Sequence, residues 1–62
     1  MNELGIVAFK QEISVGDEIS VNTREHEYCG KVTAIAKNTF DIDEGIMEFT
    51  ISYAHVWGYS KQ

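Results

Sequence analysis

Two histidines and a single cysteine are the residues of this 62-residue chain with the clearest capacity for metal or nucleophilic chemistry. His26 and Cys29 have a His-x-x-Cys spacing, and His55 lies near the other end of the chain. Structural zinc sites usually have clearer paired Cys or His ligands, and a nucleophilic cysteine needs neighbours that stabilise its thiolate. No phosphate-binding loop or serine triad is present. We therefore predict no enzyme, no catalytic residue, no metal and no cofactor, with Cys29 a small apolar residue on a strand and both histidines at the surface.

Carboxylates gather around Gly45, where the chain reads DIDEGIME. A catalytic acid–base pair needs a cleft that shifts one pKa, and the twelve-residue spacing of an EF-hand loop is absent. Asp41, Asp43, Glu44 and Glu48 are interpreted first as a solvated face. The functional alternative is an acidic docking face for a basic partner.

Four aromatic residues form the other candidate binding set: Tyr28, Tyr53, Trp57 and Tyr59. If Val56 faces the core, alternation along a strand predicts that Trp57 and Tyr59 face outward. Tyrosine and tryptophan are enriched at binding hot spots because they combine a large contact area with a polar group. The non-functional alternative is that Trp57 covers an open end of the fold.

Short segments with strand patterns position these residues. Ile19 and Val21 alternate with polar residues after Gly16, which is typical of a half-buried strand. Val32 and Ile35 are three apart, so both can face the core only if the strand contains a bulge. Gly30 suits a place where two strands approach closely.

The next segments also alternate and are separated by turn signals. TFDID follows a predicted turn at Asn38, and MEFTIS follows Gly45, where a tight hairpin requires positive φ. Tyr53–His55 fits a single turn before a last strand from Val56 to Tyr59. The predicted inward residues are Ile19, Val21, Val32, Ile35, Phe40, Ile42, Met47, Phe49, Ile51 and Val56.

The first segment, LGIVAF, is open to two interpretations. A short helix would place Leu4, Val7, Ala8 and Gln11 on one side. Gly5 weakens a helix by about 1 kcal/mol, and the β-branched and aromatic residues favour extended structure. We predict a strand.

Composition limits the class of protein. One cysteine excludes an internal disulfide, no signal-peptide pattern is present, and no run approaches the roughly 20 apolar residues that span a bilayer. We therefore expect a cytoplasmic protein without membrane contact. The net charge of −5 disfavours binding to nucleic-acid phosphates.

Two stretches resemble the pattern of SH3-like barrels. VGDEISV places Gly-Asp before a strand, and YCGKVTAIAKNTFDI contains Gly-x-Val-x-x-Ile and a short alternating strand. Sm-like, KOW and Tudor domains and the C-terminal domain of biotin protein ligases share versions of this pattern. The ending MEFTISYAHVWGY is similar to the last strand and turn of Veg-like proteins of Gram-positive bacteria. The resemblance implies a fold and does not select a function.

We predict an all-β fold in which residues 1–62 form a single domain. Residues 16–59 form a small antiparallel SH3-like barrel with a short turn before the last strand. The barrel has five strands, or six if the uncertain segment 1–14 pairs as a strand rather than forming an arm.

The predicted function is a non-catalytic interaction or regulatory module, bacterial or phage-derived, whose partner is another protein. One alternative is a barrel of Sm-like or KOW-like kind that binds single-stranded nucleic acid through Lys31, Lys37, Tyr53 and Trp57. Resemblance to Tudor domains implies an aromatic cage that holds a cation. Another alternative is a structural subunit that forms homo-oligomers through LGIVAF.

Overall fold

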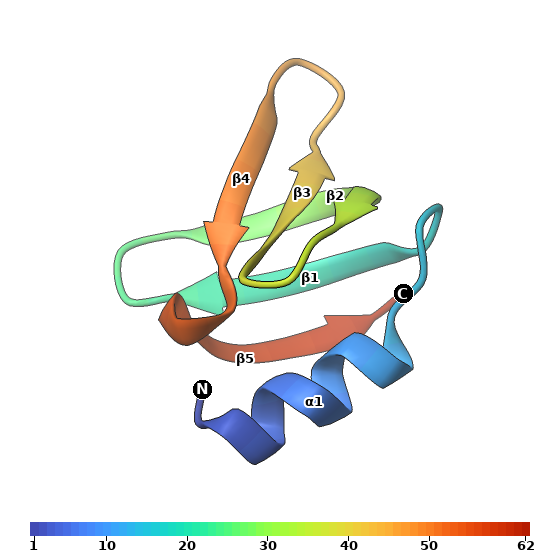
Figure 1. Cartoon of the computed structure of the whole chain (residues 1–62). Helices are drawn as coiled ribbons and strands as arrows, with labels where there is room; N and C mark the ends of the chain where they lie inside the picture. Colours follow the sequence, from blue (N-terminus) through green and yellow to red (C-terminus); the bar gives the residue numbers. More distant parts are fainter.

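The alternating segments form five antiparallel strands, and a helix precedes them (Figure 1). The computed structural model describes residues 1–62. In chain order the elements are α1 (Glu3–Glu12), β1 (Glu18–Thr23), β2 (Glu27–Ile35), β3 (Thr39–Asp43), β4 (Glu48–Ser52), the 3-10 turn η1 (Tyr53–His55) and β5 (Val56–Lys61). The five strands and the short turn before the last strand are confirmed.

The strands form one sheet in the order β4-β3-β2-β1-β5. Strands β1 to β4 follow one another as a meander, and β5 returns to pair with β1. β4 and β5 are at the two ends of this order and do not pair with each other. The sheet is therefore bent but open, and the predicted closure into a barrel is not present.

A bulge in β2 bends the sheet as the spacing of Val32 and Ile35 predicts. Val32 pairs with Ile42 and Ala34 pairs with Asp41, so Thr33 is the extra residue. On the same strand, a Cβ on Gly30 would lie 2.3 Å from the carbonyl oxygen of Asp43. Only glycine permits this approach without a shift of the backbone.

A second bulge, in β5, corrects the prediction for Tyr59. Asn22 pairs with Gly58 and Thr23 pairs with Val56, which leaves Trp57 as the extra residue. Strict alternation is therefore broken after Val56. Trp57 is 72% exposed, as predicted, whereas Tyr59 lies opposite the buried Val21 and packs against the core.

The core contains most of the predicted inward residues. The buried set is Phe9, Ile13, Ile19, Val21, Val32, Phe40, Ile42, Ile51, Tyr53 and Val56. Ile35 and Phe49 are half-buried and pack against this set. Met47 is exposed, contrary to the prediction, because β4 begins at Glu48 and Met47 belongs to the preceding turn.

The predicted first strand is wrong, because residues 3–12 form the helix α1. The Asn2 side chain caps the helix by accepting a hydrogen bond from the Gly5 amide at 2.8 Å. Ile6, Phe9 and Ile13 recur at helical spacing and face the core, and Leu4 remains exposed. Burial of Phe9 thus outweighs the local preference for extended structure. The helix is too short and too polar to cross a membrane.

Candidate functional site

The two edges of the sheet have different surroundings. Along β5, the Phe9 ring of α1 lies 4.4 Å from the Tyr59 ring, centroid to centroid. The Tyr59 hydroxyl donates a hydrogen bond to the Glu12 carboxylate, and Lys61 Nζ donates to the Glu12 carbonyl at 2.9 Å. The helix thus runs beside β5 and covers this edge (Figure 1).

The opposite edge, along β4, pairs with no further strand. Met47 accepts a bond from the Glu44 amide at 3.0 Å, and the Tyr53 amide donates to the Asn38 carbonyl at 3.2 Å. Backbone groups of an antiparallel strand alternate in direction, so the amides and carbonyls of the odd-numbered residues from 47 to 53 point toward β3. The amides of Glu48, Thr50 and Ser52 and the carbonyls of Glu48 and Thr50 therefore point away from the sheet, with no partner strand, whereas the Ser52 carbonyl begins the 3-10 turn η1.

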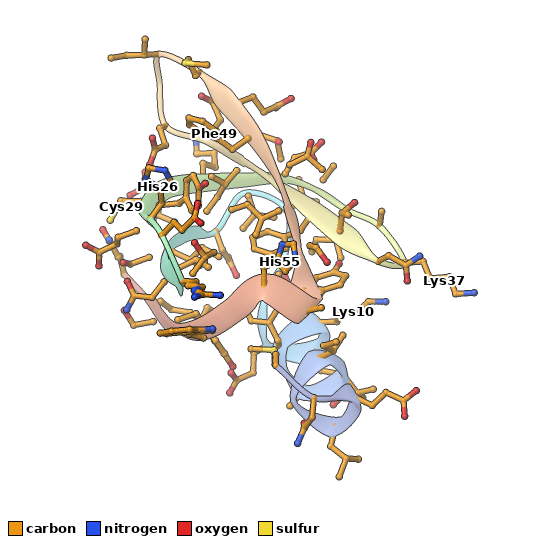
Figure 2. All side chains as sticks on the ribbon, turned by 90° about the vertical axis from the view of Figure 1, so that its left-hand side faces the viewer. Lys10, His26, Cys29, Lys37, Phe49 and His55 are labelled. Atoms are coloured by element: carbon orange, nitrogen blue, oxygen red, sulfur yellow. The ribbon has the colours of Figure 1, made fainter.

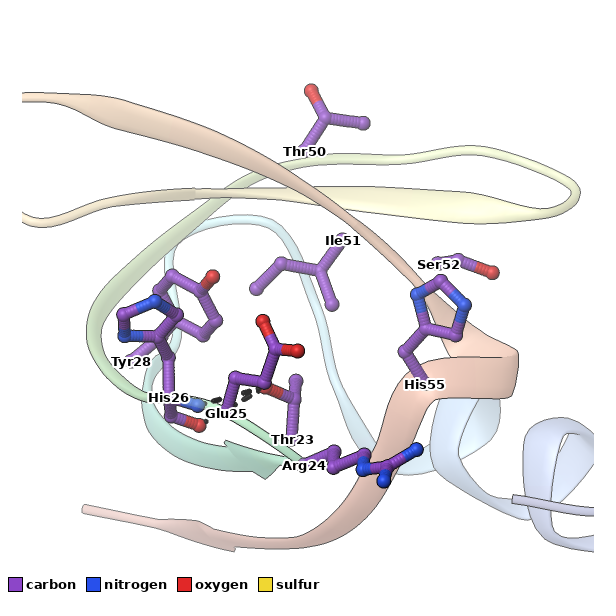
Figure 3. A pocket seen from close by; sticks show the side chains of 9 residues that line it. All are labelled: Thr23, Arg24, Glu25, His26, Tyr28, Thr50, Ile51, Ser52 and His55. Atoms are coloured by element: carbon purple, nitrogen blue, oxygen red, sulfur yellow. Dashed lines mark hydrogen bonds between the residues drawn. The ribbon is translucent and has the colours of Figure 1, made fainter.

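A cavity of about 390 Å³ borders this open edge (Figure 3). It is lined by residues 23–26 of the β1–β2 turn, Tyr28, residues 50–52 at the end of β4, and His55. Hydrogen bonds between Thr23 and His26 hold the turn: Thr23 Oγ1 donates to the His26 carbonyl at 3.1 Å and accepts from the His26 amide at 3.2 Å. We call this cavity, together with the free edge of β4, the β4 cleft.

The β4 cleft has a mostly polar lining with two apolar residues. Ile51 projects into it, and the half-buried Tyr28 ring lies to one side with His26 (Figure 3). Tyr28 is fixed by the Phe49 ring, whose centroid is 5.1 Å away. Arg24 and Glu25 supply opposite charges at the rim. Tyr28 and Ile51 are the two apolar residues of a lining that is otherwise polar, and Ile51 is itself largely buried in the core.

The metal and nucleophile candidates are divided between two places. His26 and His55 line the β4 cleft, whereas Cys29 lies in a separate hollow with Glu18 and Glu44. No group of three or more His, Cys, Asp or Glu side chains is placed to hold one ion. The Cys29 thiol is 3.4 Å from Ser20 Oγ, which is not a base that activates a thiol.

The predicted acidic residues share one face of the β3–β4 hairpin, where Asp43 lies directly opposite Glu48. Thr50 Oγ1 donates a hydrogen bond to Asp41 at 2.7 Å, and Thr33 Oγ1 donates to Glu48 at 2.8 Å. The one salt bridge of the molecule joins Lys61 to Asp17, away from this hairpin. We call Asp41, Asp43 and Glu48 the acidic face.

The four predicted aromatic residues are not brought together. Tyr53 is in the core, where its ring stacks on Phe40 and its hydroxyl donates to the Ala36 carbonyl at 2.6 Å. Burial raises the pKa of Tyr53 above its ordinary value. Tyr59 packs under α1, and its hydrogen bond to Glu12 raises its pKa, with burial and the Glu12 charge adding to the effect. Only Tyr28 belongs to the β4 cleft.

The sequence reasoning missed much of this site. Arg24, Glu25, Thr50 and Ser52 line the cleft, and none carries a motif. The alternation of β4 was visible, but it indicates the direction of side chains and not which strand ends the sheet. No protein-family model, curated protein or solved structure matches the chain.

Proposed function

We propose that this protein is a non-catalytic protein-interaction module in which an extended segment of a partner binds in the β4 cleft. The observation that carries the proposal is the free edge of β4 beside a preformed cavity. An extended peptide can add a strand to such an edge, with main-chain hydrogen bonds for affinity and an adjacent pocket for specificity. Glu48 and Thr50 supply their amides and carbonyls, Ser52 supplies its amide, and the half-buried Tyr28 supplies apolar contact beside the largely buried Ile51.

A non-catalytic function agrees with the separation of the reactive groups. Nucleophilic catalysis needs a nucleophile and a base within hydrogen-bond reach of each other. Cys29 and the two histidines lie in different hollows. A binding function needs no such pairing, because it depends on the shape and polarity of the cleft.

We further propose that the fold is an open variant of the SH3-like barrel that the sequence resembles. The strand order, the bulge in β2 and the 3-10 turn before β5 support this assignment. In this interpretation β4 and β5 are the two edge strands that a closed barrel would bring together.

No observation favours nucleic-acid binding over protein binding. Tyr53 is buried and cannot stack on a base. Lys10 and Lys37 lie on the side of the molecule opposite His26 and Cys29 (Figure 2), and the Lys10 amine donates to the Lys37 carbonyl at 3.3 Å. Self-association through LGIVAF stays a prediction, but because that segment is helical it would bury Leu4 and Val7 against a neighbour and would not pair as a strand.

Site-specific photocrosslinking in the organism that encodes the chain tests the proposed function. A photoreactive phenylalanine at Thr50, on the open edge, is compared with one at the exposed Ser60 on the covered strand β5. We expect discrete protein adducts from position 50 that position 60 does not give. Equal adducts at both positions, or no protein adduct at position 50, would overturn the proposal.

A further inference from the structure

We infer that the segment bound in the β4 cleft is a basic strand, with lysine or arginine at every second position and apolar residues between them. This inference rests on the proposed function and specifies the chemistry of the partner. The inference depends on a difference between the two faces of β4: the outer face is acidic, and the inner face borders the cavity.

The outer face of an added strand would meet the acidic face. Side chains of neighbouring strands lie about 5 Å apart, so every second residue of the partner would stand beside Glu48 or Thr50. Asp41 is opposite Thr50, and Asp43 is opposite Glu48, one strand further into the sheet. A lysine or arginine chain is long enough to reach both strands.

No salt bridge neutralises the acidic face. Like charges directly opposite on neighbouring strands destabilise a sheet, and Asp43 and Glu48 form such a pair. Lys31 is in register with Asp43 but forms no salt bridge with it. A basic side chain from the partner would reduce this repulsion at the moment of binding.

The inner face of the added strand would meet Tyr28 and Ile51, the two apolar residues of a lining that is otherwise polar. Phe49 and Ile51 point to the interior side of β4, and Ile51 and Tyr28 line the cavity. Apolar partner residues between the basic ones would therefore enter the β4 cleft. The five residues of β4 accommodate a partner segment of about 17 Å.

A second copy of the chain fits this edge less well. Its β5 edge is covered by α1, so a β4–β5 contact between copies would displace the helix. A symmetric β4–β4 contact would place two acidic faces side by side on one continuous sheet, between molecules of net charge −5. Charge complementarity thus favours a basic segment from another protein.

Titration of the ¹⁵N-labelled full chain with synthetic peptides tests the inference. Three nine-residue peptides alternate valine with lysine, with threonine or with glutamate. We expect the lysine peptide to shift the amides of Glu48, Thr50 and Ser52 and to bind at least about tenfold more tightly than the threonine peptide, because two or three charge pairs form. The glutamate peptide is expected to cause no shift of these amides.

Matched single substitutions test whether the Glu48 carboxylate contributes to binding of the lysine peptide. Glu48→Gln is expected to weaken binding of the lysine peptide about threefold, while Glu3→Gln, an exposed change of equal charge on α1, leaves it unchanged. Glu48→Gln should also raise the thermal midpoint, since it relieves repulsion from Asp43 and keeps an acceptor for Thr33. That result would show that the variant is folded.

Other outcomes separate this inference from the proposed function. If the threonine peptide bound β4 as tightly as the lysine peptide, the basic partner would be excluded and strand addition would stand. If the β4 amides shifted with protein concentration alone, the occupant would be a second copy and the inference would be wrong. If no peptide shifted them although position 50 crosslinks, the partner is not a basic strand of this pattern.

Discussion

The two edge strands of this small sheet differ in what packs against them. The helix packs along β5 through Phe9 and Glu12, whereas the backbone groups of β4 at Thr50 and its neighbours meet no element. An exposed edge is a template for pairing with other chains, and proteins protect such edges with a covering element or with charge. This 62-residue chain thus has one edge strand packed against a helix and one beside a cavity, and the proposed binding role of β4 rests on that difference.

Removal of the Phe9 ring should have the largest effect, because it detaches the cover from β5. Phe9 is fully buried against Phe40, Tyr53 and Tyr59. We expect Phe9→Ala to lower the free energy of unfolding by about 3 to 5 kcal/mol in urea titrations followed by circular dichroism. Leu4→Ala, on the exposed side of the same helix, should change it by less than about 0.5 kcal/mol. Similar small losses for both variants would mean that the helix does not secure β5.

Gly30→Ala tests the bend that sets the position of the two edges. The added methyl group would lie 2.3 Å from the Asp43 carbonyl oxygen, so β2 or β3 has to shift. We expect a loss of about 2 to 3 kcal/mol in the same assay. Gly58→Ala is the matched control, because its methyl group would meet nothing within 4 Å. An equal loss in both variants would contradict a specific close approach at Gly30.

The strands were predictable from the sequence, but the element that covers them was not. Alternation located β1, β3 and β4, and the Val32–Ile35 spacing located the bulge at Thr33. The helix was missed because its local preferences favour a strand, and only the tertiary packing of Phe9 reverses them. The bulge at Trp57 was missed because regular alternation from Val56 was assumed.

The site was less predictable than the fold. The acidic face follows from alternation within one hairpin, so Asp41, Asp43 and Glu48 were found. The cavity combines the β1–β2 turn with the end of β4 and the nearby His55, and most of β2 and all of β3 lie between them in the chain. Nothing local in the sequence indicates that these segments meet.

Proline at two facing positions measures whether β4 is an edge. The Thr50 amide points away from the sheet. The amide of Asp41, the residue directly opposite on the inner strand β3, points toward β2. We expect Asp41→Pro to cost about 1 to 3 kcal/mol more than Thr50→Pro, since only the former removes a bond of the ladder. Thr50→Pro should remain folded, and the lysine peptide should no longer shift its Glu48 and Ser52 amides. Equal losses of stability would show that the Thr50 amide is not free.

Alkaline titration tests the contact between Tyr59 and Glu12. The folded pKa of Tyr59 lies above its ordinary value near 10, so folding favours the protonated phenol. This contribution to stability is complete below about pH 10 and decreases as the pH rises through the folded pKa. Between pH 9 and pH 11, the free energy of unfolding of Tyr59→Phe should therefore fall by less than that of the native chain. Urea titrations with a reductant measure both. The raised pKa of Tyr53 remains in both proteins, so the difference reports Tyr59.

Trp57→Ala should have the smallest effect, although tryptophan is the residue most often found at binding hot spots. Trp57 is 72% exposed at the bulge of β5, on the strand that α1 covers, and it does not line the β4 cleft. We expect the free energy of unfolding to change by less than about 0.5 kcal/mol and crosslinking from position 50 to continue. If Trp57→Ala abolished these crosslinks while the protein stayed folded, the partner would also contact the covered side, and the open edge alone would not account for binding.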